Sequence, residues 1–178
     1  MATTSKANAL ELEAVLDRYE VPLVRYAHRL TGDLETARDV VQDVFLRLLR
    51  QKAPPPESRL AAWLYTVCRN RAIDVIRRRR AALRFQRPGW HAAVDDGGLE
   101  ASDGADPRLL AAVAALPVLQ QEALWLKFVD GLSYAQIGTV MDKSPGHVGV
   151  IIHEAMVTLR RVLVPSAAAA HSTGGDQA

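Results

Sequence analysis

The sequence predicts an all-α protein made of two small helical domains joined by a flexible acidic linker. Apolar residues recur at three- and four-residue spacing along most of the chain. No stretch long enough to form a β-strand alternates between apolar and polar residues. A polar, glycine-containing segment at 86–106 interrupts this pattern. The chain has 178 residues, of which 49% are hydrophobic, enough for one domain or two small ones. We therefore expect domains at 10–85 and 107–164 and a disordered tail at 165–178.

The composition excludes several classes of protein. No window approaches the roughly 18 consecutive apolar residues of a membrane span, and acidic residues near the N-terminus replace the apolar core of a secretion signal. We therefore expect a cytoplasmic protein without a membrane span. The single cysteine, Cys68, excludes an internal disulfide and a multi-cysteine zinc site. Its spacing from Leu64 and Ala72 predicts a small core residue.

Charge is distributed unevenly along the chain. Residues 1–90 carry 17 Lys and Arg against 10 Asp and Glu, residues 91–106 carry 5 acids and no Lys or Arg, and residues 107–178 carry 5 of each sign. The first part thus has a net charge of +7, although the whole chain has only +2. A basic half favours a polyanionic partner, because Lys and Arg release counterions from phosphates. A solvated basic surface without a partner explains the charge equally well.

Three amphipathic helices are expected in the first domain. The first spans residues 10–30. The second begins after its N-cap, Asp33, and ends at the proline run 54–56. The third begins after its cap, Ser58, and finishes in the arginine run 77–80.

The second domain contains a candidate helix-turn-helix. Ser133 followed by Gln136 has the pattern of a capping box, and Ser144 followed by Pro145 marks a second helix start. We expect the small side chain of Ala135 to allow the two helices to cross closely. An ordinary helical hairpin has the same spacing, so this alternative stays open on spacing alone.

Several motifs occur in an order that is more specific than any one of them. They are Asp39–Leu48 (DVVQDVFLRL), Ala62-Trp63-Leu64 with Arg69-Asn70, Leu116-Pro117 with Gln120–Leu124, and Gly131-Leu132-Ser133-Tyr134. With these motifs the sequence resembles the extracytoplasmic-function (ECF) sigma factors, the promoter-recognition subunits of bacterial RNA polymerase. The resemblance implies sigma region 2 at 10–85 and sigma region 4 at 107–164. It also implies a factor that binds core polymerase, helps to melt and read the −10 element, and binds the −35 element.

The resemblance implies a polymerase-binding surface on the second helix. Carboxylates, an amide and flanking apolar groups can pair with a basic coiled coil while excluding water. A solvated acidic first turn would explain Asp39 alone but not the whole cluster. The residues implied are Asp39, Gln42, Asp43, Phe45 and Leu46.

The third helix is implied to contact the −10 element. Its arginine and amide side chains can follow the phosphates of a separated strand and bind exposed base edges. Trp63 is instead expected in the core, because it is in register with Leu60 and Leu64. The −10 residues implied are Arg69, Asn70, Asp74, Arg77 and Arg78.

The second helix of the helix-turn-helix is implied to contact the −35 element. The residues implied are Lys143, Ser144, Gly146, His147, Val148, His153 and Arg160. The sequence departs from the family here, since Gly149, Val150 and Glu154 stand where Lys or Arg is usual. Glu154 would repel phosphate unless it accepts a hydrogen bond from cytosine. We therefore expect weak binding of this domain to duplex DNA.

Other functions fit the sequence less well. The histidines are scattered, and no phosphate loop, nucleophile elbow or paired-carboxylate motif is present, so we expect no catalytic residue, metal or cofactor. A stand-alone helix-turn-helix regulator would need a basic recognition helix and a dimer interface. An adaptor that keeps the sigma fold without promoter recognition remains an alternative because of Glu154. The expected partners are core RNA polymerase and promoter DNA, and the resemblance also allows an anti-sigma factor.

Overall fold

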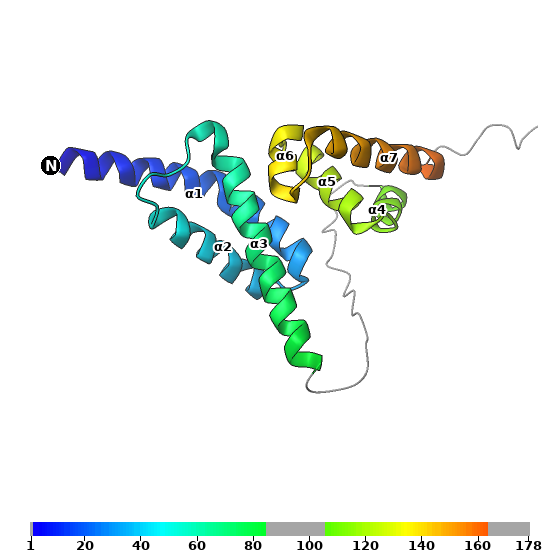
Figure 1. Cartoon of the computed structure of the whole chain (residues 1–178), viewed down its shortest axis with the longest axis horizontal. Coiled ribbons are helices and arrows are strands. Elements are labelled where there is room, and N and C mark those ends of the chain that lie inside the picture. The colour runs from blue at the N-terminus through cyan, green and yellow to red at the C-terminus, as the bar shows by residue number, and fades with distance from the viewer. Residues whose placement is uncertain (1, 85–105, 164–178) are drawn as a thin grey trace, which may run out of the picture.

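The computed structural model describes residues 2–84 and 106–163, and within these ranges the regular structure is entirely helical (Figure 1). The expected all-α fold is confirmed. Nearly all of the expected linker and the whole expected tail lie outside the described residues. The helices are α1 (Ala2–Thr31), α2 (Leu34–Leu49), α3 (Glu57–Arg84), α4 (Pro107–Ala114), α5 (Val118–Phe128), α6 (Tyr134–Met141) and α7 (Pro145–Leu163).

Helices α1–α3 pack against one another and form an N-terminal unit. The apolar positions predicted from the periodicity meet in its core, where Leu23, Val44, Leu64 and Cys68 are all fully buried. Trp63 is partly buried and packs against this core, as expected. The unit therefore owes its shape to three amphipathic faces that bury one another.

Local signals predicted the start of α2 correctly. The Asp33 carboxylate accepts a hydrogen bond from the backbone N–H of Thr36 at 2.8 Å, so Asp33 is the N-cap. Gly32 precedes it with φ 72°, a left-handed conformation that favours glycine. This turn reverses the chain between α1 and α2.

Four helix boundaries differ from the expectation, one of which is the end of α3, which continues past the arginine run 77–80 to Arg84. Helix α1 already begins at Ala2, in a segment rich in Ala, Leu, Glu and Lys, which have high helix propensity. Helix α2 ends at Leu49, before the prolines. Helix α3 begins at Glu57 rather than after Ser58, because the Pro56 carbonyl accepts a hydrogen bond from the N–H of Arg59 at 2.8 Å. Ser58 therefore lies in the first turn.

Helices α4–α7 form a C-terminal unit that contains the expected helix-turn-helix. The capping box is confirmed: the backbone N–H of Gln136 donates to Ser133 Oγ at 3.3 Å, and that of Ser133 donates to Gln136 Oε1 at 2.8 Å. Pro145 is the first residue of α7, and Ser144 Oγ accepts from the N–H of His147 at 3.2 Å. Both helix starts are thus fixed by side chains that the sequence identified.

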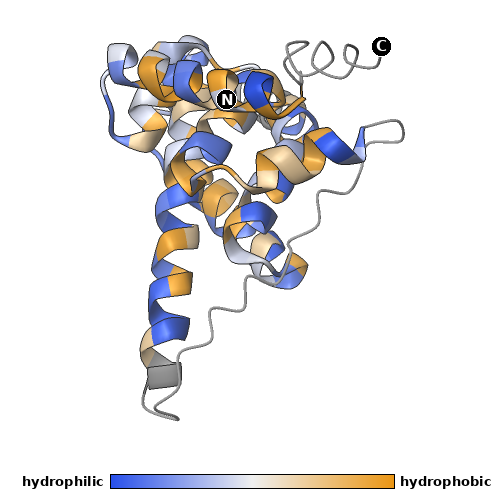
Figure 2. Cartoon of the chain, turned by 90° about the vertical axis from the view of Figure 1, so that its right-hand side faces the viewer, coloured by the Kyte–Doolittle hydropathy of each residue, from blue (hydrophilic) through white to orange (hydrophobic). Residues whose placement is uncertain are grey.

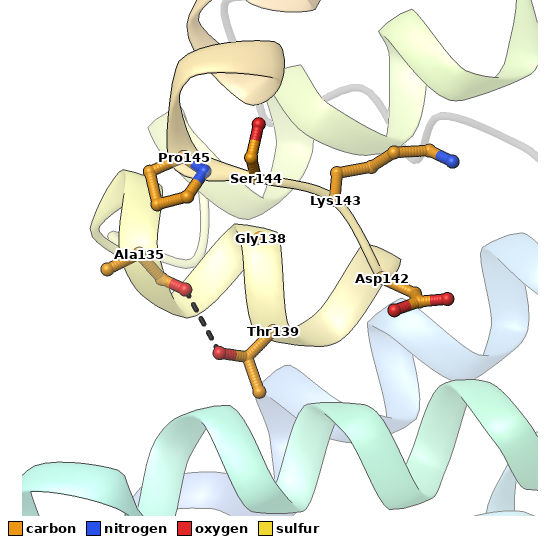
Figure 3. Close-up of a pocket in the computed structure, with 7 residues that line it drawn as sticks. All are labelled: Ala135, Gly138, Thr139, Asp142, Lys143, Ser144 and Pro145. Atoms are coloured by element: carbon orange, nitrogen blue, oxygen red, sulfur yellow. Dashed lines mark hydrogen bonds between the residues drawn. The ribbon is translucent and has the colours of Figure 1, made fainter.

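The close approach in the turn between α6 and α7 depends on Gly138 rather than Ala135 (Figure 3). A Cβ atom at Gly138 would lie 2.6 Å from the backbone oxygen of Lys143, whereas Ala135 is exposed. Asp142 closes α6 in the left-handed conformation, with φ 55°. The role expected for Ala135 is therefore wrong, because the turn folds back over the later position.

The two units contact each other through α3 and α6, so α6 lies between α3 and α7 (Figure 1). The C-terminal end of α3 projects beyond this contact and carries alternating hydrophilic and hydrophobic bands (Figure 2). Among the described residues, none of the helices is both long enough and apolar enough for a membrane crossing.

Candidate polymerase and nucleic-acid interfaces

Helix α2 presents an acidic and amide-bearing surface to solvent. Asp39 and Gln42 are exposed, and Leu46 beside them keeps 46% of its surface accessible. Asp43 is half-buried and its Oδ2 accepts a hydrogen bond from Arg71 Nε at 2.6 Å, which ties α2 to α3. Polar groups and one apolar side chain are therefore available together for a protein partner.

Phe45 requires a correction. It is only 7% exposed and belongs to the core of the N-terminal unit. The α-helical period explains this position, because Phe45 shares the inward face with Val41 and Leu48. It supports the α2 surface from beneath. Of the two apolar residues expected on this surface, Leu46 is the one that a partner can reach.

The exposed part of α3 is strongly basic. The exposed residues include the arginine run 77–80. Asn70, seven residues before Arg77, is also exposed. Asp74 Oδ1 accepts a hydrogen bond from Arg77 Nη2 at 2.8 Å, which holds that side chain along the helix. Such a surface can bind successive phosphates of a nucleic-acid strand.

Arg69 is separated from this group by its position in the contact between the two units. Its Nε donates to Glu122 Oε1 at 2.8 Å and its Nη2 donates to Glu122 Oε2 at 3.2 Å. The Tyr26 hydroxyl donates to the same Oε1 at 2.7 Å. The side chains of Arg69 and Glu122 are only 19% and 5% exposed. The hydrogen bond to Glu122 raises the pKa of Arg69, so the guanidinium stays charged.

Further charged groups line the same contact. The Arg29 guanidinium carbon lies 3.3 Å from the centroid of the Trp125 ring, a cation–π arrangement. Burial raises the pKa of Asp130, although the Tyr65 hydroxyl and the cations Arg29 and Arg25 act in the opposite direction. The contact therefore contains a cation–π pair and a partly buried carboxylate besides the Arg69–Glu122 ion pair.

The sequence interpretation missed Glu122. It is buried, and one helical turn separates it from Leu126, which is fully buried. A carboxylate in register with a buried leucine is uncommon unless it is paired. That register was the available signal, but it could not identify the partners, which come from a distant part of the sequence.

Helix α7 exposes a face with few cations. Lys143, Ser144, Gly146, His147, His153 and Arg160 are all exposed, as a DNA-binding face requires. Val150 is 54% exposed, and exposed Glu154 accepts a hydrogen bond from Gln120 Nε2 at 3.4 Å. The face between its two ends therefore carries imidazoles, an apolar group and a carboxylate.

Val148 requires the second correction. It is fully buried in the core of the C-terminal unit, so it anchors α7 and does not reach a ligand. A shallow hollow beside this helix is lined by residues of the turn, including Gly138, Lys143 and Ser144 (Figure 3).

Candidate chemical groups outside these surfaces are inert or absent within the described residues. Burial raises the pKa of the Cys68 thiol to about 12, so the thiolate is not formed at neutral pH. Cys68 is thus a core residue, as expected. No group of three His, Cys, Asp or Glu side chains in the described ranges is arranged to hold a metal ion.

The chain matches two protein families. Sigma-70 region 2 matches residues 15–82, and Sigma-70, region 4 matches residues 107–159. The ECF RNA polymerase sigma factor SigL of Mycobacterium tuberculosis is 34% identical, with 92% of this chain and 96% of SigL covered. The ECF RNA polymerase sigma factor BldN of Streptomyces coelicolor is 32% identical over 92% of this chain, which spans 65% of BldN.

A solved structure has a similar arrangement over most of the chain. It is the sigma factor RpoE in complex with the anti-sigma factor NepR, from Bartonella quintana. The TM-score is 0.67 at 25% sequence identity, with 90% of this chain and 99% of that chain covered. Together with the two family matches and the identity to SigL, this shows that the chain belongs to the ECF sigma factors of RNA polymerase.

Proposed function

We propose that this chain binds core RNA polymerase through its N-terminal unit and directs the polymerase to promoters through both units. The observation that carries the proposal is the separation of three exposed surfaces: an acidic face on α2, an arginine-rich end on α3, and a helix-turn-helix in the C-terminal unit. Each surface matches one task of a sigma factor. We assign region 2 to 10–85 and region 4 to 107–164.

The α2 surface provides the polymerase contact. Asp39 and Gln42 can pair with a basic partner, and Leu46 can exclude water from the contact. Asp43 contributes through its ion pair with Arg71, which fixes α2 against α3. Polar and charged groups around an exposed apolar side chain favour a specific and reversible protein contact.

The α3 surface provides the −10 contact. Asn70 can hydrogen-bond the edge of an unpaired base, and Arg77 and Arg78 can bind phosphates of the separated strand. Asp74 holds Arg77 in place through its hydrogen bond. Arg69 joins this surface when the two units separate.

The α7 surface provides the −35 contact. The helix starts at Pro145 behind a Ser144 cap. Proline has no N–H, and the N–H groups of His147 and Val148 donate to Ser144, so Gly146 supplies the backbone N–H that can bind a DNA phosphate. His147 and His153 can contact base edges, and Val150 can contact a thymine methyl group. Polymerase holds this helix near the promoter, so weak binding can still select a sequence.

Four further assignments complete the proposal. The chain performs no chemical reaction and acts in the cytoplasm, where polymerase and DNA are found. An anti-sigma factor is a suitable regulator, because the similar RpoE structure is itself a complex with an anti-sigma factor. No cofactor is needed for any of these tasks.

Run-off transcription tests the proposal. Core bacterial polymerase is incubated with a promoter library, with and without the chain, and the transcripts are sequenced. We expect new start sites that depend on the chain. Polymerase binding without any new transcript would instead support an adaptor that has lost promoter recognition, the alternative suggested by exposed Glu154.

A further inference from the structure

We propose that Glu122 occupies Arg69 in the free protein in place of a phosphate of the promoter strand, so that closure of the two units competes with DNA binding. The proposal rests on the proposed function of α3 as the −10 surface. The three residues Tyr26, Arg69 and Glu122 are called the Glu122 contact below. They belong to different units, and their hydrogen bonds join α1 and α3 to α5.

The geometry of the Glu122 contact resembles the recognition of a phosphate. Two guanidinium nitrogens donate to two different oxygens of one carboxylate, at 2.8 and 3.2 Å. Arginine binds carboxylates and phosphates with the same fork of parallel N–H groups. The carboxylate therefore satisfies the donors that a strand phosphate would otherwise use.

Because Arg69 is mostly buried, it cannot bind Glu122 and a strand phosphate at the same time. The side chains of Arg69 and Glu122 are 19% and 5% exposed, and Tyr26, whose hydroxyl shares the Glu122 carboxylate, is only 2% exposed. A strand cannot reach Nε or Nη2 while Glu122 holds both. Release of Arg69 therefore requires that the C-terminal unit moves away from α3.

The chemistry of the contact suits a reversible closure. A buried ion pair gains electrostatic energy but loses the hydration of both charges, and the two effects nearly cancel. An apolar contact of the same size would have no such opposing effect. On separation, Glu122, Arg69 and the Tyr26 hydroxyl all regain water. The same groups still specify the closed arrangement, because an unmatched charge would be costly.

The rest of the basic surface remains accessible in the closed state. Arg77 and Arg78 are exposed, and within the described ranges α2 has no extensive contact with the C-terminal unit. Polymerase or a strand can thus bind before the units separate. Binding and opening are then coupled, and each must favour the other by the same factor.

The test uses the full chain and two matched variants. Glu122→Gln removes the charge and keeps the shape of the side chain. Glu20→Gln removes an equal charge from an exposed position on α1. Small-angle scattering gives the radius of gyration, and fluorescence anisotropy gives the affinity for a labelled single strand of thymidines at low salt.

We expect the wild type and Glu20→Gln to be compact and Glu122→Gln to be extended. Glu122→Gln should bind the thymidine strand roughly three- to tenfold more tightly than Glu20→Gln, because Arg69 no longer has to be released. The charge exchange Arg69→Glu with Glu122→Arg should restore the compact form. Tyr26→Phe should give a smaller opening, and it replaces Glu122→Gln as the test if circular dichroism shows that the latter does not fold.

Two results would overturn the proposal. One is an equal radius of gyration for Glu122→Gln and Glu20→Gln, and the other is an equal affinity of these variants for the thymidine strand. Capture of the wild type by core polymerase is measured separately and decides the proposed function. The competition and the sigma function can therefore fail independently.

Discussion

The two helices assigned to promoter DNA differ in charge and in their surroundings. Helix α3 carries a run of four exposed arginines near its C-terminal end, whereas α7 has no Lys or Arg between Pro145 and Leu159. Helix α3 also contacts the other unit, through Arg69, while the N-terminal turns of α7 are exposed. The basic helix is thus the one that is partly covered, and the helix with few cations is the one that is open.

This difference has a physical reason. A basic helix gains affinity for any nucleic acid by releasing counterions, so it binds with little dependence on sequence. Covering part of it limits such binding in the free protein. A helix with few cations gains little from phosphates and depends on base contacts and on being held near its site. The predictions below test this division, from the largest expected effect to the smallest.

The first prediction concerns the turn that positions α7. Gly138→Ala should destabilise the C-terminal unit by about 1–3 kcal/mol, because the new Cβ would lie 2.6 Å from a backbone oxygen that cannot move alone. Gly149→Ala is the control, since a Cβ at that position would have no atom within 4 Å apart from its chain neighbours and the backbone of its own helix, and alanine favours the helix. Urea unfolding measures both variants. We expect Gly149→Ala to gain up to about 1 kcal/mol, and equal stabilities would refute the role of Gly138.

The second prediction concerns the α2 surface, through which polymerase would hold α7 near the promoter. Asp39→Arg combined with Gln42→Ala should weaken binding to core polymerase by about tenfold or more, since both side chains are exposed and charge reversal repels a basic partner. Circular dichroism should remain unchanged. Glu20→Arg reverses an exposed charge on another helix and should bind as the wild type does. Surface plasmon resonance with immobilised polymerase measures all three, and unchanged binding by the double variant would exclude this surface.

Local features of the fold were predictable from the sequence, whereas contacts between distant segments were not. Asp33, Ser133 and Ser144 act within three residues of their own positions, so a short motif contains both donor and acceptor. Glu122 binds partners from α1 and α3, and no local pattern specifies them. Gly138 is a similar case, because the turn after it determines which small residue is approached.

The candidate site was predictable to the same extent. The helical period placed Asp39, Gln42 and the arginine run 77–80 on exposed faces, but it did not show that Arg69 is covered by the other unit. It did not separate Phe45 and Val148 from their exposed neighbours, because the resemblance identifies a motif as a whole and not the side of the helix that each residue occupies. Whether these surfaces bind polymerase and promoter DNA stays a prediction.

The third prediction compares the phosphate contacts of α3 and α7 directly. Arg78→Ala should reduce the log–log salt slope for a labelled single strand by about 0.7, and Glu154→Arg should steepen the slope for a labelled duplex by about 0.9, each the value of one phosphate. Arg108→Ala on α4 removes an exposed cation away from both helices and serves as the control. Anisotropy across a salt series gives the slopes. If Glu154→Arg left the duplex slope unchanged, α7 would not lie against the DNA backbone.

The last prediction compares an aspartate of each unit, because their pKa values shift in opposite directions. Hydrogen bonds from the Thr36 side chain and backbone lower the pKa of Asp33, whereas burial raises the pKa of Asp130. Asp33 therefore stabilises the fold above its ordinary pKa of 3.8, and this stabilisation is lost as pH falls through its lowered pKa. Asp130 has the reverse effect: its contribution is fully present below 3.8 and is lost as pH rises through its raised pKa.

Substitution by asparagine separates the two effects, since an amide does not titrate. Asp130→Asn should flatten the pH dependence of the urea midpoint just above pH 3.8, and Asp33→Asn should flatten it below that value while still capping α2. The expected changes are small because each involves one group. Midpoints measured across this range for the wild type and both variants decide the matter. Parallel curves for Asp130→Asn and the wild type would mean that Asp130 is solvated, and hence that the contact between the two units is open in the free protein.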